Sequence, residues 1–270
     1  MKQSELQQLC KNVQQLVLKT AEMIRKERKQ FKSKTGVEVK GHSNFVTYID
    51  KLSEEKLVNG LSELLPEAGF IAEEGTSTKK GEVYNWVIDP IDGTTNFIHG
   101  LSPYAISIAL MRKGHVVLGV VHEISHGEMF CAWEGSKAYF NGKVISVSEN
   151  KEHQEALIAT GFPYYDMGKL DPFINCMKEV MDKTGGVRRL GSAAMDICYV
   201  ACGQFEAFWE YGLHPWDVAA GALILKQAGG IVCDFNGDDG YIFNGQIIAS
   251  NANYFNKFYE IVHQHLGNHE

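Results

Sequence analysis

The segment Trp86-Val87-Ile88-Asp89-Pro90-Ile91-Asp92-Gly93-Thr94-Thr95-Asn96 runs from an apolar strand into an acidic turn. Its first three residues are bulky or β-branched, which is typical of a buried strand. Asp89 and Asp92 flank Pro90, so both carboxylates and the Ile91 carbonyl can face one point. Hard oxygen donors in this arrangement suit Mg²⁺. The segment therefore predicts a strand that ends in a metal-binding turn.

The residues that follow, Gly93-Thr94-Thr95, could open a helix. Free backbone N–H groups and the positive end of the helix dipole would then meet an anion. Gly93 carries no side chain that would block a phosphate. Carboxylates for a metal beside free N–H groups for phosphate are what a phosphomonoesterase needs. Taken alone, however, the same residues are equally typical of a polar turn.

Two further acidic positions stand where apolar structure meets a turn or a helix start. Glu73 and Glu74 follow the apolar run of residues 69–72, and Asp217 ends the run of residues 212–217. Carboxylates at such junctions project from the end of an element, where sites tend to form. If Glu73 and Asp217 join the two aspartates of the first segment, four carboxylates share one pocket. Like-charge repulsion would keep some of them protonated unless two divalent cations bind.

The 270 residues are enough for one large domain or for two closely packed halves. Helical spacing predicts helices over residues 6–24, 50–65, 172–182, 192–202 and 216–227. Short apolar runs predict strands over residues 86–88, 105–110, 116–121, 129–133, 138–140, 157–159, 206–209, 231–234 and 247–249. We expect residues 1–150 to form an N-terminal α+β half that carries the main metal and phosphate motifs. Residues 151–270 would form a C-terminal half that completes the site.

Composition and charge bear on the class of function. Hydrophobic residues make up 44% and charged residues 22% of the chain, as in ordinary globular proteins. The net charge of -7 argues against nucleic-acid binding, because neutralising phosphates needs a basic surface. No apolar run reaches the ~20 residues of a membrane span, and the polar start, residues 1–5, differs from a signal peptide. The six cysteines form no C-x-x-C pair, so we expect reduced thiols and a cytoplasmic protein.

Three motifs give the chain a resemblance to the inositol monophosphatase family of Mg²⁺-dependent, lithium-sensitive phosphatases. They are Ala72-Glu73-Glu74-Gly75, the segment Trp86–Phe97 and Trp216-Asp217-Val218-Ala219-Ala220-Gly221, within a match from about Val46 to Ala252. Gly75 departs from the family's usual Ser or Thr, and Thr160–Tyr164 resembles bacterial members. The resemblance implies an α+β fold, a layered α/β/α/β sandwich of the inositol monophosphatase and fructose-1,6-bisphosphatase type.

The resemblance also implies the metal ligands. The carboxylates of Glu73 and Asp89 and the carbonyl of Ile91 would hold one Mg²⁺ ion. Asp89, Asp92 and Asp217 would hold a second ion. Glu73 would also touch a weaker third ion, so two or three Mg²⁺ ions are expected in each site.

The same resemblance assigns the remaining roles. Thr94, backed by Asp50, would act with Glu73 to orient or deprotonate the attacking water. The Gly93 and Thr94 amides would bind phosphate. Asp92 would contact a substrate hydroxyl, and the alcohol pocket would be lined by Gly191, Ser192, Ala193 and Glu210. Lys40 matches a family lysine only with a one-residue gap.

The expected reaction is in-line attack of a metal-activated water on a small phosphorylated polyol, chiefly myo-inositol-1-phosphate. Three related substrates stay open, because they differ only in the alcohol pocket: 3′-phosphoadenosine 5′-phosphate, fructose-1,6-bisphosphate and histidinol phosphate. A different class also stays open, a regulatory protein of the transcription machinery that retains the fold. The resemblance implies a homodimer.

Overall fold

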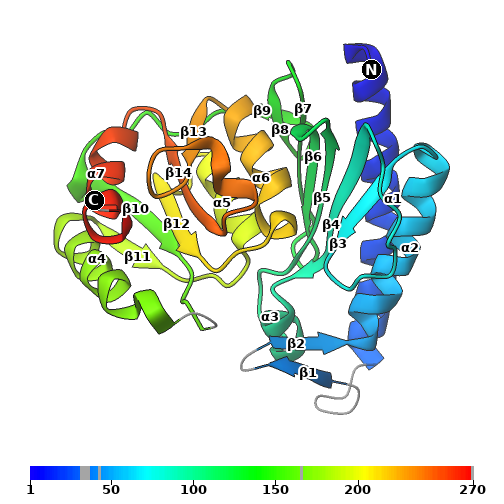
Figure 1. Ribbon diagram of the computed structural model, residues 1–270, viewed down its shortest axis with the longest axis horizontal. Coiled ribbons are helices and arrows are strands. Elements are labelled where there is room, and N and C mark those ends of the chain that lie inside the picture. The colour runs from blue at the N-terminus through cyan, green and yellow to red at the C-terminus, as the bar shows by residue number, and fades with distance from the viewer. Residues whose placement is uncertain (31–36, 42–43, 165–166, 269–270) are drawn as a thin grey trace.

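Figure 1 shows the computed structural model, which describes residues 1–30, 37–41, 44–164 and 167–268, with side chains for all of these except 37–41 and 44–46. Helices α1 (Gln3–Gln30) and α2 (Tyr48–Leu64) cover the outer face of a seven-stranded sheet. Helices α5 (Ala193–Ala201) and α6 (Pro215–Gln227) lie between this sheet and a five-stranded one. The expected α/β/α/β order is therefore present. Helices α4 (Leu170–Lys183) and α7 (Phe255–Leu266) add an outer layer on the second sheet.

The seven-stranded sheet has the order β3-β4-β5-β6-β7-β8-β9. Strands β3 and β4 are parallel, and every later neighbour pairs antiparallel. Alternate residues of its central strands face two different hydrophobic cores, which explains their continuous apolar sequence. The bounds are β3 (Gly69–Ala72), β4 (Tyr84–Asp92), β5 (Ala105–Arg112), β6 (His115–Glu123), β7 (Glu128–Trp133), β8 (Ala138–Phe140) and β9 (Lys143–Ile145).

The five-stranded sheet has the order β11-β10-β12-β14-β13. Strand β10 runs parallel to both of its neighbours, and β14 runs antiparallel to β12 and β13. The bounds are β10 (Leu157–Thr160), β11 (Gly186–Arg188), β12 (Ala207–Tyr211), β13 (Gly230–Cys233) and β14 (Gln246–Asn251). The remaining elements are the pair β1 (Val37–Gly41) and β2 (Asn44–Thr47), helix α3 (Thr94–His99), and the 3₁₀ turns His153–Glu155, Met167–Lys169 and Asp239–Ile242.

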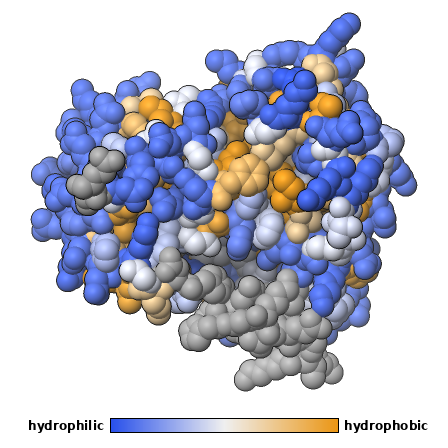
Figure 2. Space-filling view, in the orientation of Figure 1, coloured by the Kyte–Doolittle hydropathy of each residue, from blue (hydrophilic) through white to orange (hydrophobic). Residues whose placement is uncertain are grey.

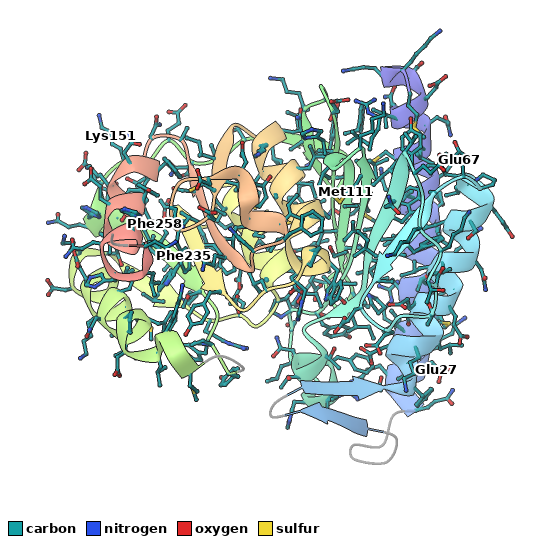
Figure 3. The ribbon with its side chains drawn as sticks, viewed as in Figure 1. Glu27, Glu67, Met111, Lys151, Phe235 and Phe258 are labelled. Carbon is teal, nitrogen blue, oxygen red and sulfur yellow. The ribbon has the colours of Figure 1, made fainter. Side chains whose placement is uncertain are left out.

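Three hydrophobic cores hold the layers together. Trp86 lies fully buried in the core beneath α1 and α2, and Met111 belongs to the core around α5 and α6. Phe235 and Phe258 belong to the core beneath α4 and α7, and Figure 3 shows Phe258 on α7 and Phe235 next to it. Hydrophilic residues cover most of the face shown in Figure 2.

Two local features place the acidic segments. On β4, Asp89 pairs with Ser107 of β5 but Asp92 pairs with Ala105, so the strand carries one extra residue around Pro90. Proline has no N–H for the ladder, and such a bulge re-aims the neighbouring side chains. Helix α6 lies directly on the sheet, since a Cβ on Gly119 of β6 would come within 2.6 Å of the α6 backbone. These two features bring the end of β4 and the start of α6 together.

All the predicted helices and strands are confirmed, with most ends within three residues of the prediction. The first helix continues six residues further, to Gln30, and β4 continues four residues further, to Asp92. Helix α7 and strands β1, β2, β9 and β11 were not predicted. The short run of residues 69–72 is the strand β3, paired with β4. Across the described residues, the helices are all too short or too polar to cross a membrane.

Candidate active site

Three aspartates meet where the two halves of the fold join. Asp89 and Asp92 come from the bulged end of β4, and Asp217 comes from the first turn of α6. Each offers a carboxylate oxygen, and these three oxygens all lie within 4.8 Å of one another. They line a cavity of about 640 Å³. Segments about 120 residues apart in sequence thus supply one acidic cluster.

The cavity gathers almost all the residues that the sequence singled out. Lining it are Glu73, Asp89, Ile91, Asp92, Gly93, Thr94, Gly191, Ser192, Ala193, Glu210 and Asp217. Asp50 does not line the cavity but lies behind Thr94. Lys40 lies in β1, and its side chain is outside the described residues. Other lining residues received no role from the sequence, among them Arg189, Asp196, His214 and Trp216.

A backbone N–H holds each of the three aspartates. Ile91 N donates to Asp89 Oδ1 at 2.8 Å, and His214 N donates to Asp217 Oδ2 at 2.6 Å. Ala194 N donates to Asp92 Oδ2 at 2.8 Å. Backbone donors fix each carboxylate in place, because they cannot move without the chain around them.

Asp92 also joins the two halves of the chain. Its Oδ2 accepts a hydrogen bond from Ser192 Oγ at 2.6 Å, across 100 positions of sequence. The Nδ2 of Asn96 donates to the carbonyls of Pro103 and Leu190, each at 2.8 Å. The Ser192 hydroxyl, expected at the alcohol pocket, is therefore engaged with Asp92.

Position 93 requires glycine because of its backbone conformation and the backbone atoms packed around it. Its φ is +95°, and a Cβ there would lie 3.0 Å from the carbonyl oxygens of Gly191 and Pro103. The crowding comes from backbone, so any side chain would be strained. A helix does follow, but α3 has only six residues.

The Thr94 hydroxyl has two acceptors within reach. Its Oγ1 lies 3.2 Å from Asp50 Oδ1 and 3.0 Å from the Ile91 carbonyl oxygen. Thr47, which caps α2, donates to Asp50 Oδ2 from its N at 2.8 Å and from its Oγ1 at 2.5 Å. Asp50 is thereby oriented with its other oxygen toward Thr94. The Thr47-x-x-Asp50 spacing is the sequence signal of this cap.

The turn that carries Glu73 is held by a residue the sequence reasoning missed. Glu54 of α2 is fully buried. Its Oε2 accepts from Glu74 N at 2.7 Å, and its Oε1 accepts from Thr76 N and Thr76 Oγ1, both at 2.8 Å. Gly75 stands at the position where the resemblance predicted Ser or Thr, and the neighbouring Thr76 supplies a hydroxyl to this turn. No sequence signal pairs Glu54 with a turn about 20 residues away.

Burial dominates the electrostatics of the site. Burial, and then the neighbouring carboxylates, raise the pKa values of Asp89 and Asp217 well above the usual range. Burial raises the pKa of Asp92 to about 6, against the opposing effect of its hydrogen bonds from Ser192 and α5. Burial also raises the pKa of Asp50 to about 6 and that of Glu210 to about 8. A cluster of this kind favours bound cations over ionised, unpaired carboxylates.

The donor set fits a hard divalent cation. The carboxylates of Asp89, Asp92 and Asp217 converge, and Glu73 and Ile91 line the same cavity, so a carboxylate and a carbonyl oxygen lie near them. No cysteine is among the lining residues in the described part of the chain, and His214 stacks on the Trp216 ring at 4.8 Å between centroids. Oxygen-only sites with several carboxylates suit Mg²⁺.

The fold and the site define a class of layered α+β proteins with an acidic pocket, suited to divalent metal ions, between two sheets. A sequence profile described as the inositol monophosphatase family matches residues 5–267. The chain belongs to the inositol monophosphatase family. The α+β sandwich of the inositol monophosphatase type, expected from the sequence, is therefore confirmed.

Named relatives fall into two groups. A protein of Neisseria meningitidis named putative Nus factor SuhB is 41% identical over 228 residues, 84% of this chain and 87% of that protein. The inositol-1-monophosphatase of Mesorhizobium japonicum is 38% identical over 216 residues, 80% of this chain and 81% of that protein.

Solved structures show the same division of names. The extragenic suppressor protein suhB of Bartonella henselae has a TM-score of 0.88 at 34% identity, covering 93% of this chain and 97% of that one. The IMPase TM1415 of Thermotoga maritima has a TM-score of 0.83 at 36% identity, covering 93% and 94%.

The pKa shifts predict how pH changes the stability of the metal-free protein. The folded state holds protons on Asp92 and Glu210 up to about pH 6 and pH 8, whereas the unfolded chain releases them near pH 4 to 4.5. Stability from these groups is therefore present below about pH 4 and is lost as pH rises toward 8. With EDTA, unfolding by urea should show a fall in unfolding free energy between about pH 5 and pH 8.

Added Mg²⁺ should reverse this loss, and more so at the higher pH. At about 100 times its dissociation constant a ligand adds about 2.7 kcal/mol of stability. Asp217→Asn should diminish both the pH dependence and the Mg²⁺ effect, while Asp182→Asn, on the exposed side of α4, serves as the control. Equal stabilisation by Mg²⁺ at about pH 5 and about pH 8 would contradict the assignment of these aspartates as metal ligands.

The Glu54 contacts predict a loss of metal affinity at a distance. Glu54→Gln replaces one acceptor oxygen with an N–H₂ group that faces backbone donors, so the turn after Glu73 should loosen. Groups that orient ligands contribute about 10–100-fold to metal affinity. We expect at least about tenfold weaker Mg²⁺ binding by calorimetry, with Glu55→Gln at the exposed next position as the matched control. Unchanged affinity in Glu54→Gln would show that the turn is held by other contacts.

Proposed function

We propose that the protein hydrolyses the phosphate monoester of a small polyol and converts myo-inositol-1-phosphate to myo-inositol and phosphate. One observation carries the proposal: the carboxylate oxygens of Asp89, Asp92 and Asp217 converge within 4.8 Å. They do so in a cavity large enough for a sugar-sized alcohol, about 640 Å³. Membership of the inositol monophosphatase family supports the reaction class.

The residues would divide between the metal and the substrate. Glu73, Asp89 and the Ile91 carbonyl would hold one Mg²⁺ ion, and Asp89, Asp92 and Asp217 would hold a second, with a weaker third at Glu73. When bound, Mg²⁺ lowers the pKa of water and neutralises charge on phosphate oxygens. The Gly93 and Thr94 amides would bind the phosphate. The alcohol would meet Asp92, Gly191, Ser192, Ala193 and Glu210.

Thr94 and Asp50 would handle the proton of the attacking water. Thr94 Oγ1 would accept that proton while its own hydroxyl proton passes to the Asp50 carboxylate at Oδ1, 3.2 Å away. Asp50 can accept a proton because burial raises its pKa to about 6. Thr47 keeps the carboxyl in place by two hydrogen bonds to its other oxygen.

Thr94→Ala should lower kcat on myo-inositol-1-phosphate by about 10²–10⁴, the usual contribution of a group that moves a proton. Stabilisation by Mg²⁺ should persist, since the metal carboxylates are untouched. Phosphate release at saturating Mg²⁺ measures the first effect and thermal unfolding the second. Thr78→Ala, at an exposed position, should keep wild-type activity. Wild-type turnover by Thr94→Ala would remove Thr94 from the mechanism.

Related phosphatases remain alternatives within the same reaction class. 3′-Phosphoadenosine 5′-phosphate (adenosine 3′,5′-bisphosphate), fructose-1,6-bisphosphate and histidinol phosphate would use the same metal ligands. They would differ in the contacts that their alcohol parts make with Glu210 and the rest of the alcohol pocket. A Mg²⁺-dependent assay on these and on myo-inositol-1-phosphate, with and without lithium, separates them. We propose that lithium inhibits the reaction.

A regulatory role in transcription is the second candidate, favoured by the 41% identical relative named putative Nus factor SuhB. The net charge of -7 favours a protein partner over direct RNA binding. If the role exists, bacterial RNA polymerase should retain both the wild-type protein and Asp217→Asn in a pull-down, although Asp217→Asn should have lost phosphatase activity. Failure of either protein to be retained would count against the regulatory role.

We also propose that the protein is a cytoplasmic homodimer. Residues 1–150 and 151–270 would be the two halves of one catalytic unit, because Asp92 of the first and Ser192 of the second share a hydrogen bond at the site. The six free cysteines support a reducing compartment.

A further inference from the structure

Three backbone segments meet beside the cavity, next to α3. A Cβ on Gly93, in the turn after β4, would lie 3.0 Å from the carbonyl oxygens of both Pro103 and Gly191. Pro103 belongs to the segment before β5, and Gly191 to the segment before α5. Gly191 has a φ of +93°, and a Cβ on it would lie 3.1 Å from Asn96 Nδ2. The three segments are therefore packed backbone against backbone, with the Asn96 side chain beside them.

The side-chain amide of Asn96 joins two of these segments to α3. Its Nδ2 donates to the Pro103 carbonyl and to the Leu190 carbonyl, each at 2.8 Å. An amide N–H₂ group has two hydrogens, so both of them are used within the protein. Asn96 is 8% exposed and does not line the cavity. It can therefore affect a bound substrate only through the backbone that it holds. The sequence motif contains Asn96, but no role was assigned to it.

Two side chains of the first half hold the segment before α5. Asp92 accepts hydrogen bonds from Ser192 Oγ at 2.6 Å and from the Ala194 N–H at 2.8 Å. Asn96 holds the other end of the segment, at the Leu190 carbonyl. A change at Asp92 would alter the acidic cluster as well, because Asp92 belongs to it. A change at Asn96 leaves all three aspartates and their backbone donors in place.

We propose that Asn96 is a positioning residue for the alcohol wall, which we define as Gly191, Ser192 and Ala193. By holding the Leu190 carbonyl, it would fix the distance between this wall and the turn at Gly93. The inference rests on the proposed phosphatase function, since it concerns how the alcohol part of the substrate is held. Losing the two hydrogen bonds would let the wall shift. The contacts with the alcohol should then weaken, while those with Mg²⁺ and phosphate remain.

The test is Asn96→Ala, which removes the donor to both carbonyls. We would measure KM and kcat with Mg²⁺ on myo-inositol-1-phosphate, or on whichever related phosphate ester the wild-type protein hydrolyses. KM should rise by about tenfold, the effect of losing one or two hydrogen bonds. The value of kcat should change by less than about threefold, because the lost contacts would serve the ground state and the transition state alike.

Two binding measurements separate positioning from general damage. Inorganic phosphate has no alcohol part, so its inhibition constant should be the same in Asn96→Ala and in the wild-type protein. The affinity for Mg²⁺, measured by calorimetry, should also be unchanged. A merely structural disturbance of the site would weaken the binding of phosphate and Mg²⁺ together with that of the substrate.

Two further variants complete the test. Asn59→Ala makes the same change at an exposed position of α2 and should leave KM unchanged. Asn96→Leu also lacks the donor but has a side chain of similar volume to asparagine, so it leaves no cavity. It should show the same rise in KM, and it tests the inference even if Asn96→Ala fails to fold.

Suppose that the wild-type protein is an active phosphatase. If KM is then unchanged in the Asn96 variants, or rises together with the inhibition constant of phosphate, the inference is wrong and the phosphatase function stands. If the wild-type protein hydrolyses none of the phosphate esters, the proposed function fails and the inference fails with it.

Discussion

The structure depends on one electrostatic constraint: three aspartates must be held close together in a buried place. Each accepts a hydrogen bond from a backbone N–H. The donors to Asp89, Asp92 and Asp217 are Ile91, Ala194 and His214, respectively. Backbone donors do not relax when charges repel, so the carboxylates cannot drift apart. Burial first, and this repulsion after it, favour the protonated carboxyls, so the pKa values of Asp89 and Asp217 lie well above the usual range. Divalent cations would relieve it more fully.

The same constraint explains why the site lies between two sheets. One half supplies β4 and its bulge, and the other supplies the first turns of α5 and α6. From the second half, the hydroxyl of Ser192 and the N–H of Ala194 both donate hydrogen bonds to the Asp92 carboxylate in the first half. Ser107 Oγ of β5 donates to the Trp216 carbonyl at 2.9 Å and so fixes the start of α6 against the first sheet. Neither half by itself would assemble the acidic cluster.

Much of the fold and most of the site could be predicted from the sequence, because both follow local patterns. Apolar periodicity gave the long helices and the central strands, and the acidic motifs stand at element ends. Helix α7 also follows such a pattern, with buried Phe258, Ile261, Val262 and Leu266, and could have been predicted. Strand β11 could not, since its three residues gain strand geometry only by pairing with β10. The contacts of Glu54 and Ser192 are likewise set by tertiary packing.

The two ends of the cavity are built on different physical principles. At the metal end, backbone donors fix the aspartates, so the geometry tolerates little change without loss of the fold. At the end that would take the alcohol, the lining includes longer side chains such as those of Glu210 and Arg189. A fold built this way can keep one reaction while its substrate varies. The acidic motifs therefore indicate the class of reaction, whereas the side chains at the other end of the cavity would select the alcohol.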